Sequence, residues 1–410
     1  MTKSAEAERL LVISSDGHVG APVEQYRDYV EPKYRSDFDN WLEEFVPQWT
    51  ATQLKDSNLQ ETLSESYKRE WLKDEKTATV AAAGTCDPSV RLKVLDADGI
   101  AADVLFPDDQ STNVPPFMGN TREFDRPWRA EYSPELKLVG AKAYNRWLAE
   151  FCSAAPDRLL GLALLGSLAD VDAAVAEVTW AANNGLTGVM LPLVYYNIDE
   201  PFVNDPRYDP LWAACADLGM PVHTHNGGGS PYYGTGPDAP ILFGIECTLW
   251  PHRPLWFMTM SGVFERHPKL RLILSEQGID WVPYALMVMD AMAKDPKFAY
   301  HKNKPISLAP SEYFHRQCWL GASILRRNEV EMRHAIGLDK IMWGWDFPHI
   351  ESPDWHTPMD SIRQVMGDAP DAEIRAMLSE NAVAAYGLDA PRLQAIADRI
   401  GPTMGELVKA

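Results

Sequence analysis

The chain has 410 residues, of which 46% are hydrophobic and 23% are charged, a composition typical of globular proteins that excludes a disordered or fibrous chain. The formal net charge of −20, from 58 acidic and 38 basic residues, argues against a nucleic-acid binder. No apolar run is long enough to span a membrane, no signal peptide is visible, and the five cysteines lack the spacing of a disulfide framework or a zinc knuckle. We therefore expect a cytoplasmic protein that binds neither nucleic acid nor a membrane.

Eight short apolar runs bounded by turn signals predict buried parallel strands. In chain order they are Leu10–Ser15, Ala102–Phe106, Leu159–Leu165, Thr187–Pro192, Met220–His225, Leu270–Glu276, Gln317–Gly321 and Lys340–Trp345. Helical patterns fill the gaps: Lys142–Cys152, Leu168–Asn184, Pro206–Leu218, Trp256–Arg266, Val282–Met292, Glu329–Ile336 and Met359–Met366. Because strands and helices alternate eight times, the sequence predicts an α/β fold of the (β/α)8 TIM-barrel class.

A bare barrel needs only about 250 residues, so this chain carries long insertions within a single domain spanning residues 1–410. The surplus falls at residues 19–96, 107–134 and 226–255, each after the C-terminal end of a predicted strand. Active sites of barrels lie at that end, so the insertions are expected to form walls or a lid over one pocket. The first insertion could also serve in dimerisation, and we expect a homodimer. Residues 371–410 are predicted to be helical and to pack outside the barrel.

Metal-ligand residue types stand at four of the predicted strand ends. Asp16 and His18 follow the first strand and, being two residues apart, point to the same face. The fifth strand ends in His223-Thr224-His225, the sixth in Glu276, and the eighth leads into Asp346. Buried carboxylates are costly unless they are paired or bound to a metal, and all four strand ends meet at one rim. The sequence therefore predicts a metal site there.

This set of imidazoles and carboxylates suits Zn, Mn or Fe and leaves positions open for water or substrate. The number of ions stays open between one and two. Glu276 would bridge a pair of ions, with His223, His252 or Glu246 as additional ligands. His223 lies one pleat deeper than His225, so a second ligand and a structural hydrogen-bond donor are equal alternatives for it.

Several further residues are candidates for binding a substrate. Arg253 could hold a substrate carboxylate through two hydrogen bonds, or could instead be a structural ion-pair partner. His252 could contact substrate or be an ordinary loop histidine, and His349 could be a catalytic group or support one. Trp250 and Trp345 could line an apolar pocket for a bulky ring, and Glu246 is a further candidate for binding substrate.

The order Asp-x-His at strand one, His at strand five, an acidic or His residue at strand six and Trp-Asp-x-Pro-His at strand eight resembles the amidohydrolase superfamily. The segments at residues 91–99 and 262–270 and the pair Glu380-Asn381 resemble its amidohydrolase 2 branch, which includes aminocarboxymuconate semialdehyde decarboxylase and the resorcylate decarboxylases.

The resemblance implies that Asp16, His18 and His225 bind metal and that Asp346 binds metal and handles a proton. Two positions depart from the family pattern. Asp16 stands where many relatives have histidine, and Glu276 stands where the decarboxylases have a catalytic histidine.

These features favour a metal-dependent hydrolase or non-oxidative decarboxylase that acts on a small hydrophobic, cyclic, carboxylated metabolite. Asp346 would transfer the proton, and Glu276 would be a ligand or a second base. A different class, a non-haem iron or di-iron oxygenase that hydroxylates an apolar metabolite, fits the same carboxylate-rich rim. A catalytically dead binding protein is the third alternative.

Overall fold

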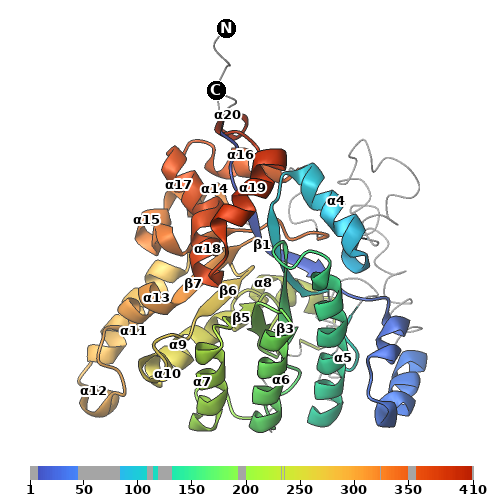
Figure 1. Ribbon diagram of the computed structural model, residues 1–410. Coiled ribbons are helices and arrows are strands. Elements are labelled where there is room, and N and C mark those ends of the chain that lie inside the picture. Colours follow the sequence, from blue (N-terminus) through green and yellow to red (C-terminus); the bar gives the residue numbers. More distant parts are fainter. Residues whose placement is uncertain are drawn as a thin grey trace.

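Eight parallel strands, hydrogen-bonded to one another in chain order, form the centre of the molecule (Figure 1). Their bounds are β1 Ile13–Val19, β2 Ala102–Pro107, β3 Leu159–Leu164, β4 Gly188–Met190, β5 Val222–His225, β6 Leu272–Ser275, β7 Cys318–Ala322 and β8 Ile341–Trp343. This computed structural model describes residues 8–44, 84–108, 114–118, 132–192 and 200–408, apart from 232, 235, 324 and 350–356. All residues of these strands are buried, as expected for a parallel sheet covered by helices.

The seam between β8 and β1 is closed differently from the seven other junctions. Among the described residues, a single bridge between Gly17 and Phe347 joins the two sides in place of a continuous ladder. Two backbone hydrogen bonds flank it: His18 N–H donates to the Phe347 carbonyl at 2.7 Å, and Asp346 N–H donates to the Asp16 carbonyl at 2.9 Å. The predicted (β/α)8 barrel is thereby confirmed.

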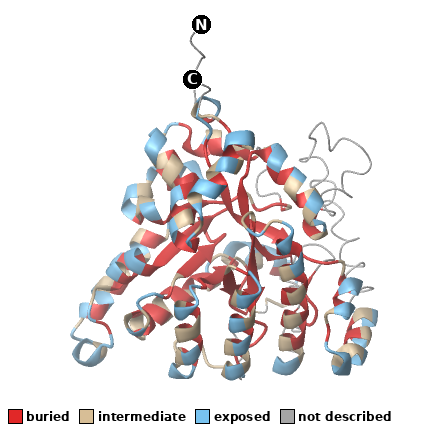
Figure 2. Ribbon diagram, in the orientation of Figure 1, coloured by how far each residue is buried: buried red, intermediate tan, exposed pale blue. Residues whose placement is uncertain are grey.

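Helices surround the strands and turn their exposed faces outward (Figure 2). Those between strands are η1 Val23–Asp28, η2 Pro32–Tyr34, α4 Pro88–Asp98, α5 Pro134–Ser153, α6 Val171–Asn183, η5 Pro206–Tyr208, α7 Asp209–Asp217, α8 Ala239–Glu246, η6 Trp250–His252, α9 Arg253–Met260, α10 Val263–Arg266, α11 Val282–Lys294, α12 Tyr300–Asn303, α13 Pro310–Gln317, α14 Arg327–Glu331, α15 Arg333–Ile336 and η7 Leu338–Lys340. After β8 come α16 Pro358–Met366, α17 Asp371–Arg375, the π-helical η8 Ala376–Glu380, α18 Asn381–Tyr386, α19 Ala390–Ile400 and α20 Met404–Leu407. Within the described residues, no helix is long and apolar enough to cross a membrane.

Local sequence signals explain where several of these helices begin. Asp87 caps α4 by accepting hydrogen bonds from two backbone N–H groups of its first turn, and Pro88 follows at the first helical position. Ser133 caps α5 in the same way, again followed by a proline. Asp170 caps α6 by accepting from the Ala173 N–H. These caps fix where each helix starts relative to the strand that precedes it.

Several predicted boundaries differ from the structure, and α5 begins at Pro134 rather than at Lys142. The first strand starts at Ile13 and continues to Val19, so Asp16 and His18 lie within it, beside a register shift against β2. The helix predicted over residues 256–266 divides at Gly262, whose φ of 76° is incompatible with a continuous right-handed helix. The helix predicted over residues 329–336 is also two short helices, α14 and α15.

The insertions lie at the predicted strand ends. Residues 35–44 are helical, and residues 45–83 of the first insertion lie outside the described part of the chain. Residues 109–113 and 119–131 of the second insertion are likewise outside it. The third insertion contains α8 and η6, and the C-terminal residues are helical as predicted. The single-domain assignment stays a prediction.

Candidate metal centre and active site

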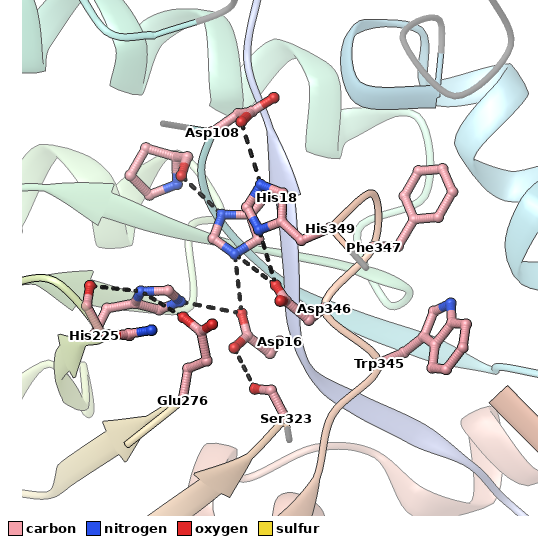
Figure 3. Close-up of polar contacts among 12 residues, drawn as sticks. Asp16, His18, Asp108, His225, Glu276, Ser323, Trp345, Asp346, Phe347 and His349 are labelled. Carbon is pink, nitrogen blue, oxygen red and sulfur yellow. Dashed lines mark hydrogen bonds and ion pairs between the residues drawn. The ribbon is translucent and has the colours of Figure 1, made fainter. Parts of the chain in front are cut away.

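Strand β1 carries Asp16 and His18 on the inner face of the barrel, and both side chains are buried. Ser323, directly after β7, donates its hydroxyl to Asp16 Oδ2 (Figure 3). The other carboxylate oxygen, Oδ1, is buried and has no hydrogen-bond partner among the described residues. One oxygen of Asp16 is thus held by the protein and the other faces the centre of the cluster.

His18 is oriented by the backbone at the end of β2. Its Nδ1 lies 2.9 Å from the Pro107 carbonyl, to which an Nδ1–H donates. Its Nε2 faces the cluster, 3.5 Å from Asp16 Oδ1 and 2.9 Å from Asp346 Oδ1. Metal-binding histidines are commonly held by such a bond from the second ring nitrogen. His18 therefore presents the nitrogen that a metal needs.

His225 and Glu276 contribute from the opposite side of the barrel. His225 Nε2 lies 3.5 Å from Asp16 Oδ1, and its Nδ1 lies 3.4 Å from Glu276 Oε2 and 3.3 Å from the Asn226 carbonyl. Glu276 follows β6 and has a φ of 56°. A left-handed backbone is uncommon for glutamate and concentrates at functional positions. Glu276 therefore lies on the Nδ1 side of the His225 ring.

Asp346 has the same backbone feature, with a φ of 62°, and it is fully buried. His349 Nδ1 lies 3.2 Å from Asp346 Oδ1, and His349 Nε2 lies 3.5 Å from Asp108 Oδ1. Burial opposes the charge on His349, but the two carboxylates outweigh it and raise the pKa of the imidazole well above its usual value. Burial also opposes ionisation of Asp346, yet His349 and His18 hold its pKa well below the usual value.

The cluster fits a divalent metal. Among the described residues, Asp16, His18 and His225 form one group with one donor atom each within 4.8 Å of the others, and His18, Asp346 and His349 form a second. The buried oxygens Asp16 Oδ1 and Asp346 Oδ2 have no hydrogen-bond partner in the described structure, so a cation between them would satisfy both. Imidazole and carboxylate donors suit Zn, Mn and Fe.

His223 has a different environment. Its Nδ1 lies 3.1 Å from the Val189 carbonyl and its Nε2 lies 3.0 Å from the Tyr386 hydroxyl, so both ring nitrogens are engaged below the metal-ligand groups. Burial lowers the pKa of His223 to about 3, so the ring is neutral. Of the two alternatives open for His223, this geometry supports the structural donor.

Two of the substrate candidates, His252 and Arg253, are adjacent in the third insertion and lie against aromatic rings. His252 is buried, stacks on Trp281 with ring centroids 3.7 Å apart, and donates from Nε2 to the Gln277 carbonyl at 3.1 Å. Arg253 lies between aromatic rings, 4.8 Å from that of Phe202 and 5.0 Å from that of Phe257. His252 is thus a buried residue in contact with Gln277 and Trp281, and not a surface histidine.

The remaining candidates are Glu246 and Trp250, which contact each other, and Trp345, which points away from the metal-ligand groups. Glu246 Oε2 accepts from the Tyr233 hydroxyl at 2.9 Å and from Trp250 Nε1 at 3.2 Å, which ties α8 to η6. Trp345 is turned away from the metal-ligand groups (Figure 3) and stacks on Trp343 at 6.4 Å. Glu246 is not in either group of possible metal ligands.

Four residues of the site are absent from the sequence-based prediction. Asp108 follows β2 and would have been found by extending the strand-end rule by two residues. Ser323 follows β7 and belongs to a residue type that the rule did not consider. Phe106 packs its ring 4.6 Å from that of His225, and Tyr386 comes from α18; neither carries a sequence signal for this site.

Comparison with known proteins identifies the family. The sequence profile described as Amidohydrolase matches residues 133–388, which is more than half of the chain. The chain belongs to the amidohydrolase family. A gamma-resorcylate decarboxylase from Rhizobium radiobacter is 27% identical over 295 residues, covering 65% of this chain and 79% of that relative. The predicted resemblance to the amidohydrolase 2 branch, which is a branch of enzymes, is thereby confirmed.

Solved structures share the fold of this amidohydrolase. An amidohydrolase from Mycobacterium avium subsp. paratuberculosis K-10 matches with a TM-score of 0.68 at 20% identity, covering 94% of this chain and all of that one. A 5-carboxyvanillate decarboxylase from Novosphingobium aromaticivorans, crystallised with manganese and a nitrobenzoic acid, matches with a TM-score of 0.60 at 17% identity, covering 94% and 100%. None of these three proteins is named as an oxygenase or a binding protein, so those two alternatives gain no support.

Proposed function

We propose that this amidohydrolase is a metal-dependent, non-oxidative decarboxylase of a small carboxylated aromatic ring. The observation that carries the proposal is the buried cluster of Asp16, His18, His225 and Asp346, with two buried carboxylate oxygens that lack hydrogen-bond partners in the described structure. The matched relatives named as decarboxylases of resorcylate and carboxyvanillate supply the reaction class. Manganese in one of the matched structures makes Mn²⁺ the first metal to test.

In this proposal Asp16, His18, His225 and Asp346 would hold the metal. The metal would supply a positive charge that orients and polarises an acidic substrate. Loss of CO2 leaves an electron pair on the ring carbon, and a proton must replace the carboxyl group. His349 holds this proton, because its pKa is raised by Asp346 and by Asp108, 3.5 Å from its Nε2. Asp346, 3.2 Å from His349 Nδ1, receives the proton from His349 and passes it to the ring carbon.

Glu276 takes a supporting role in this scheme. Its Oε2 lies 3.4 Å from His225 Nδ1, where a carboxylate can fix the ring orientation of a metal-binding histidine. The family's decarboxylases, as the sequence resemblance implies, have histidine at this strand end. The proton donor of this chain is therefore drawn from the β8 side, through His349, and not from β6.

The test is reconstitution with Mn²⁺ followed by measurement of CO2 release from 2,6-dihydroxybenzoate and 5-carboxyvanillate. Asp346→Asn keeps the shape of the side chain and the tolerance for a left-handed backbone but cannot deliver the proton. We expect bound metal and substrate turnover in the wild type, and a fall in kcat of at least about 100-fold in Asp346→Asn.

Controls separate the reaction class from the metal site. His225→Ala should lose metal as well as activity, whereas Trp345→Phe, whose side chain points away from the cluster, should retain both. Bound metal with neither acid decarboxylated would contradict the reaction class and direct the search to hydrolysable lactones and esters. Full metal content in both Asp346→Asn and His225→Ala would contradict the site itself.

A further inference from the structure

Arg91 of α4 packs against the outside of the barrel seam that carries three of the proposed ligands. Its side chain is fully buried, and its Nη2 and Nε lie 2.6 Å and 3.1 Å from Asp103 Oδ2 on β2. Side chains alternate along β1, so Gly17 faces outward between the inward-facing Asp16 and His18. A Cβ on Gly17 would lie 2.4 Å from Arg91 Nη2, which places the guanidinium directly over this glycine.

The same guanidinium contacts both sides of the seam. Nη1 lies 3.4 Å from the carbonyl oxygens of His18 and Phe347, and Nη2 lies 3.3 Å from that of Phe347. The Phe347 ring stacks 4.4 Å from the guanidinium carbon. Arg91 therefore joins β1, β2 and the segment after β8 at the place where a single bridge closes the sheet.

We propose that the Arg91–Asp103 pair is a positioning device for the metal ligands. It holds β1 and the segment after β8 at the spacing that brings His18 Nε2 within 2.9 Å of Asp346 Oδ1. This inference rests on the metal site proposed above. Functional groups need placement within about 0.5 Å, and a planar guanidinium with several fixed donors supplies such a constraint where a flexible ammonium does not.

Stability alone is a weak explanation for this pair. Replacing a buried ion pair by apolar side chains of similar volume is often neutral or stabilising, whereas removing one partner leaves an uncompensated charge. The double variant Arg91→Met/Asp103→Leu therefore removes the contacts to both carbonyl oxygens without leaving a buried charge. Arg91→Lys keeps the charge but loses the fork of donors.

Arg158 offers a matched control at the other end of β2. Its Nε lies 2.9 Å from the Ala101 carbonyl, its Nη2 lies 3.1 Å from the Ile100 carbonyl, and it pairs with Asp96 at 2.8 Å. Arg158→Met thus removes an arginine with the same kinds of partner, at a strand end remote from the metal ligands. It reports what the loss of such contacts does to the barrel in general.

The experiment measures Mn²⁺ affinity by electron paramagnetic resonance and the visible spectrum of the Co²⁺-loaded protein, with metal-free thermal unfolding as the check on folding. We expect the double variant to bind Mn²⁺ about 10–100-fold more weakly and to shift the Co²⁺ bands, as loss of a support behind a ligand commonly does. Arg91→Lys should weaken binding in the same direction. Arg158→Met should retain wild-type affinity and spectrum even where its Tm falls.

A folded double variant with wild-type Mn²⁺ affinity and Co²⁺ spectrum would overturn the positioning role. If the double variant does not fold, the same comparison of Arg91→Lys with Arg158→Met decides the question. A wild-type protein that binds neither ion would overturn the metal site and this inference together, whereas metal binding without decarboxylation would overturn only the reaction proposed above.

Discussion

Asp16 and His18 at the centre of the site each have two polar side-chain atoms, and one atom of each is hydrogen-bonded within the protein. Ser323 holds one oxygen of Asp16, and the Pro107 carbonyl holds one nitrogen of His18. What remains is a set of single donor atoms that converge on a point. Such preorganisation costs the unbound protein buried polar atoms without partners, and it favours a cation that satisfies them.

The contact between Ser323 and Asp16 gives a prediction at this scale. Ser323→Ala leaves Asp16 Oδ2 without its donor, so the carboxylate is no longer fixed, and Mn²⁺ affinity should fall about 10-fold or more. The matched control is Ser311→Ala, which removes a serine hydroxyl 2.8 Å from Asp290 Oδ2 on the helices α13 and α11. Isothermal titration with Mn²⁺ measures both, and equal affinities would contradict the supporting role of Ser323.

At the scale of elements, η6 is attached to the loop after β6 by His252, whose ring lies on Trp281. Burial lowers the pKa of this imidazole to about 4 from its usual 6.5, so the folded protein keeps it neutral. The unfolded chain binds the proton first as the pH falls, and this contribution to stability is therefore present above pH 6.5 and is lost progressively toward pH 4.

We therefore expect His252 to cost the fold about 2 kcal/mol between about pH 7 and pH 5. In His252→Phe, which can keep the stack on Trp281, the decrease in the free energy of unfolding over this range should be smaller by that amount. Urea denaturation at the two pH values measures it. His223, with a pKa of about 3, has a similar effect in the wild type and in His252→Phe, so it cancels in the comparison. If the two proteins lose the same free energy of unfolding between about pH 7 and pH 5, the assignment to His252 is wrong.

The barrel and its ligand strands were predictable because they depend on local patterns. Apolar runs define the strands, and parallel strands place their C-terminal ends at one rim, so Asp16, His18, His225 and Asp346 were expected to lie close together there, as ligand-type residues at strand ends. Residues that act through another residue lack such a pattern. Arg91 reaches the seam from a preceding helix and Tyr386 reaches His223 from α18, and neither pairing follows from spacing along the chain.

The helix breaks were missed for a related reason. A hydrophobic pattern with a helical period runs through Gly262, but the backbone there adopts a left-handed conformation that the pattern does not register. Likewise, the left-handed backbones of Glu276 and Asp346 depend on the strands and loops that enclose them. Sequence periodicity describes elements, whereas these features belong to the junctions between elements.

For the molecule as a whole, the net charge of −20 works against an anionic substrate. Long-range repulsion slows the approach of a benzoate-type anion, and salt screens it. We expect kcat/KM for the acid that serves as substrate to rise as NaCl increases from about 10 to about 200 mM, with Mn²⁺ at a saturating concentration. Inhibition by neutral resorcinol should stay constant. A decrease in kcat/KM would mean that cationic groups close to the site govern the encounter.

The seam between β8 and β1 also bears on how loading and folding are connected. Seven junctions of the barrel have hydrogen-bonded ladders, and among the described residues the eighth has one bridge with proposed metal ligands on both sides of it. A bound ion would connect the first strand to the segment after the last one. Its contribution to the free energy of unfolding would grow with the logarithm of the free metal concentration. The junction with a single bridge is then the one that a bound metal ion would reinforce.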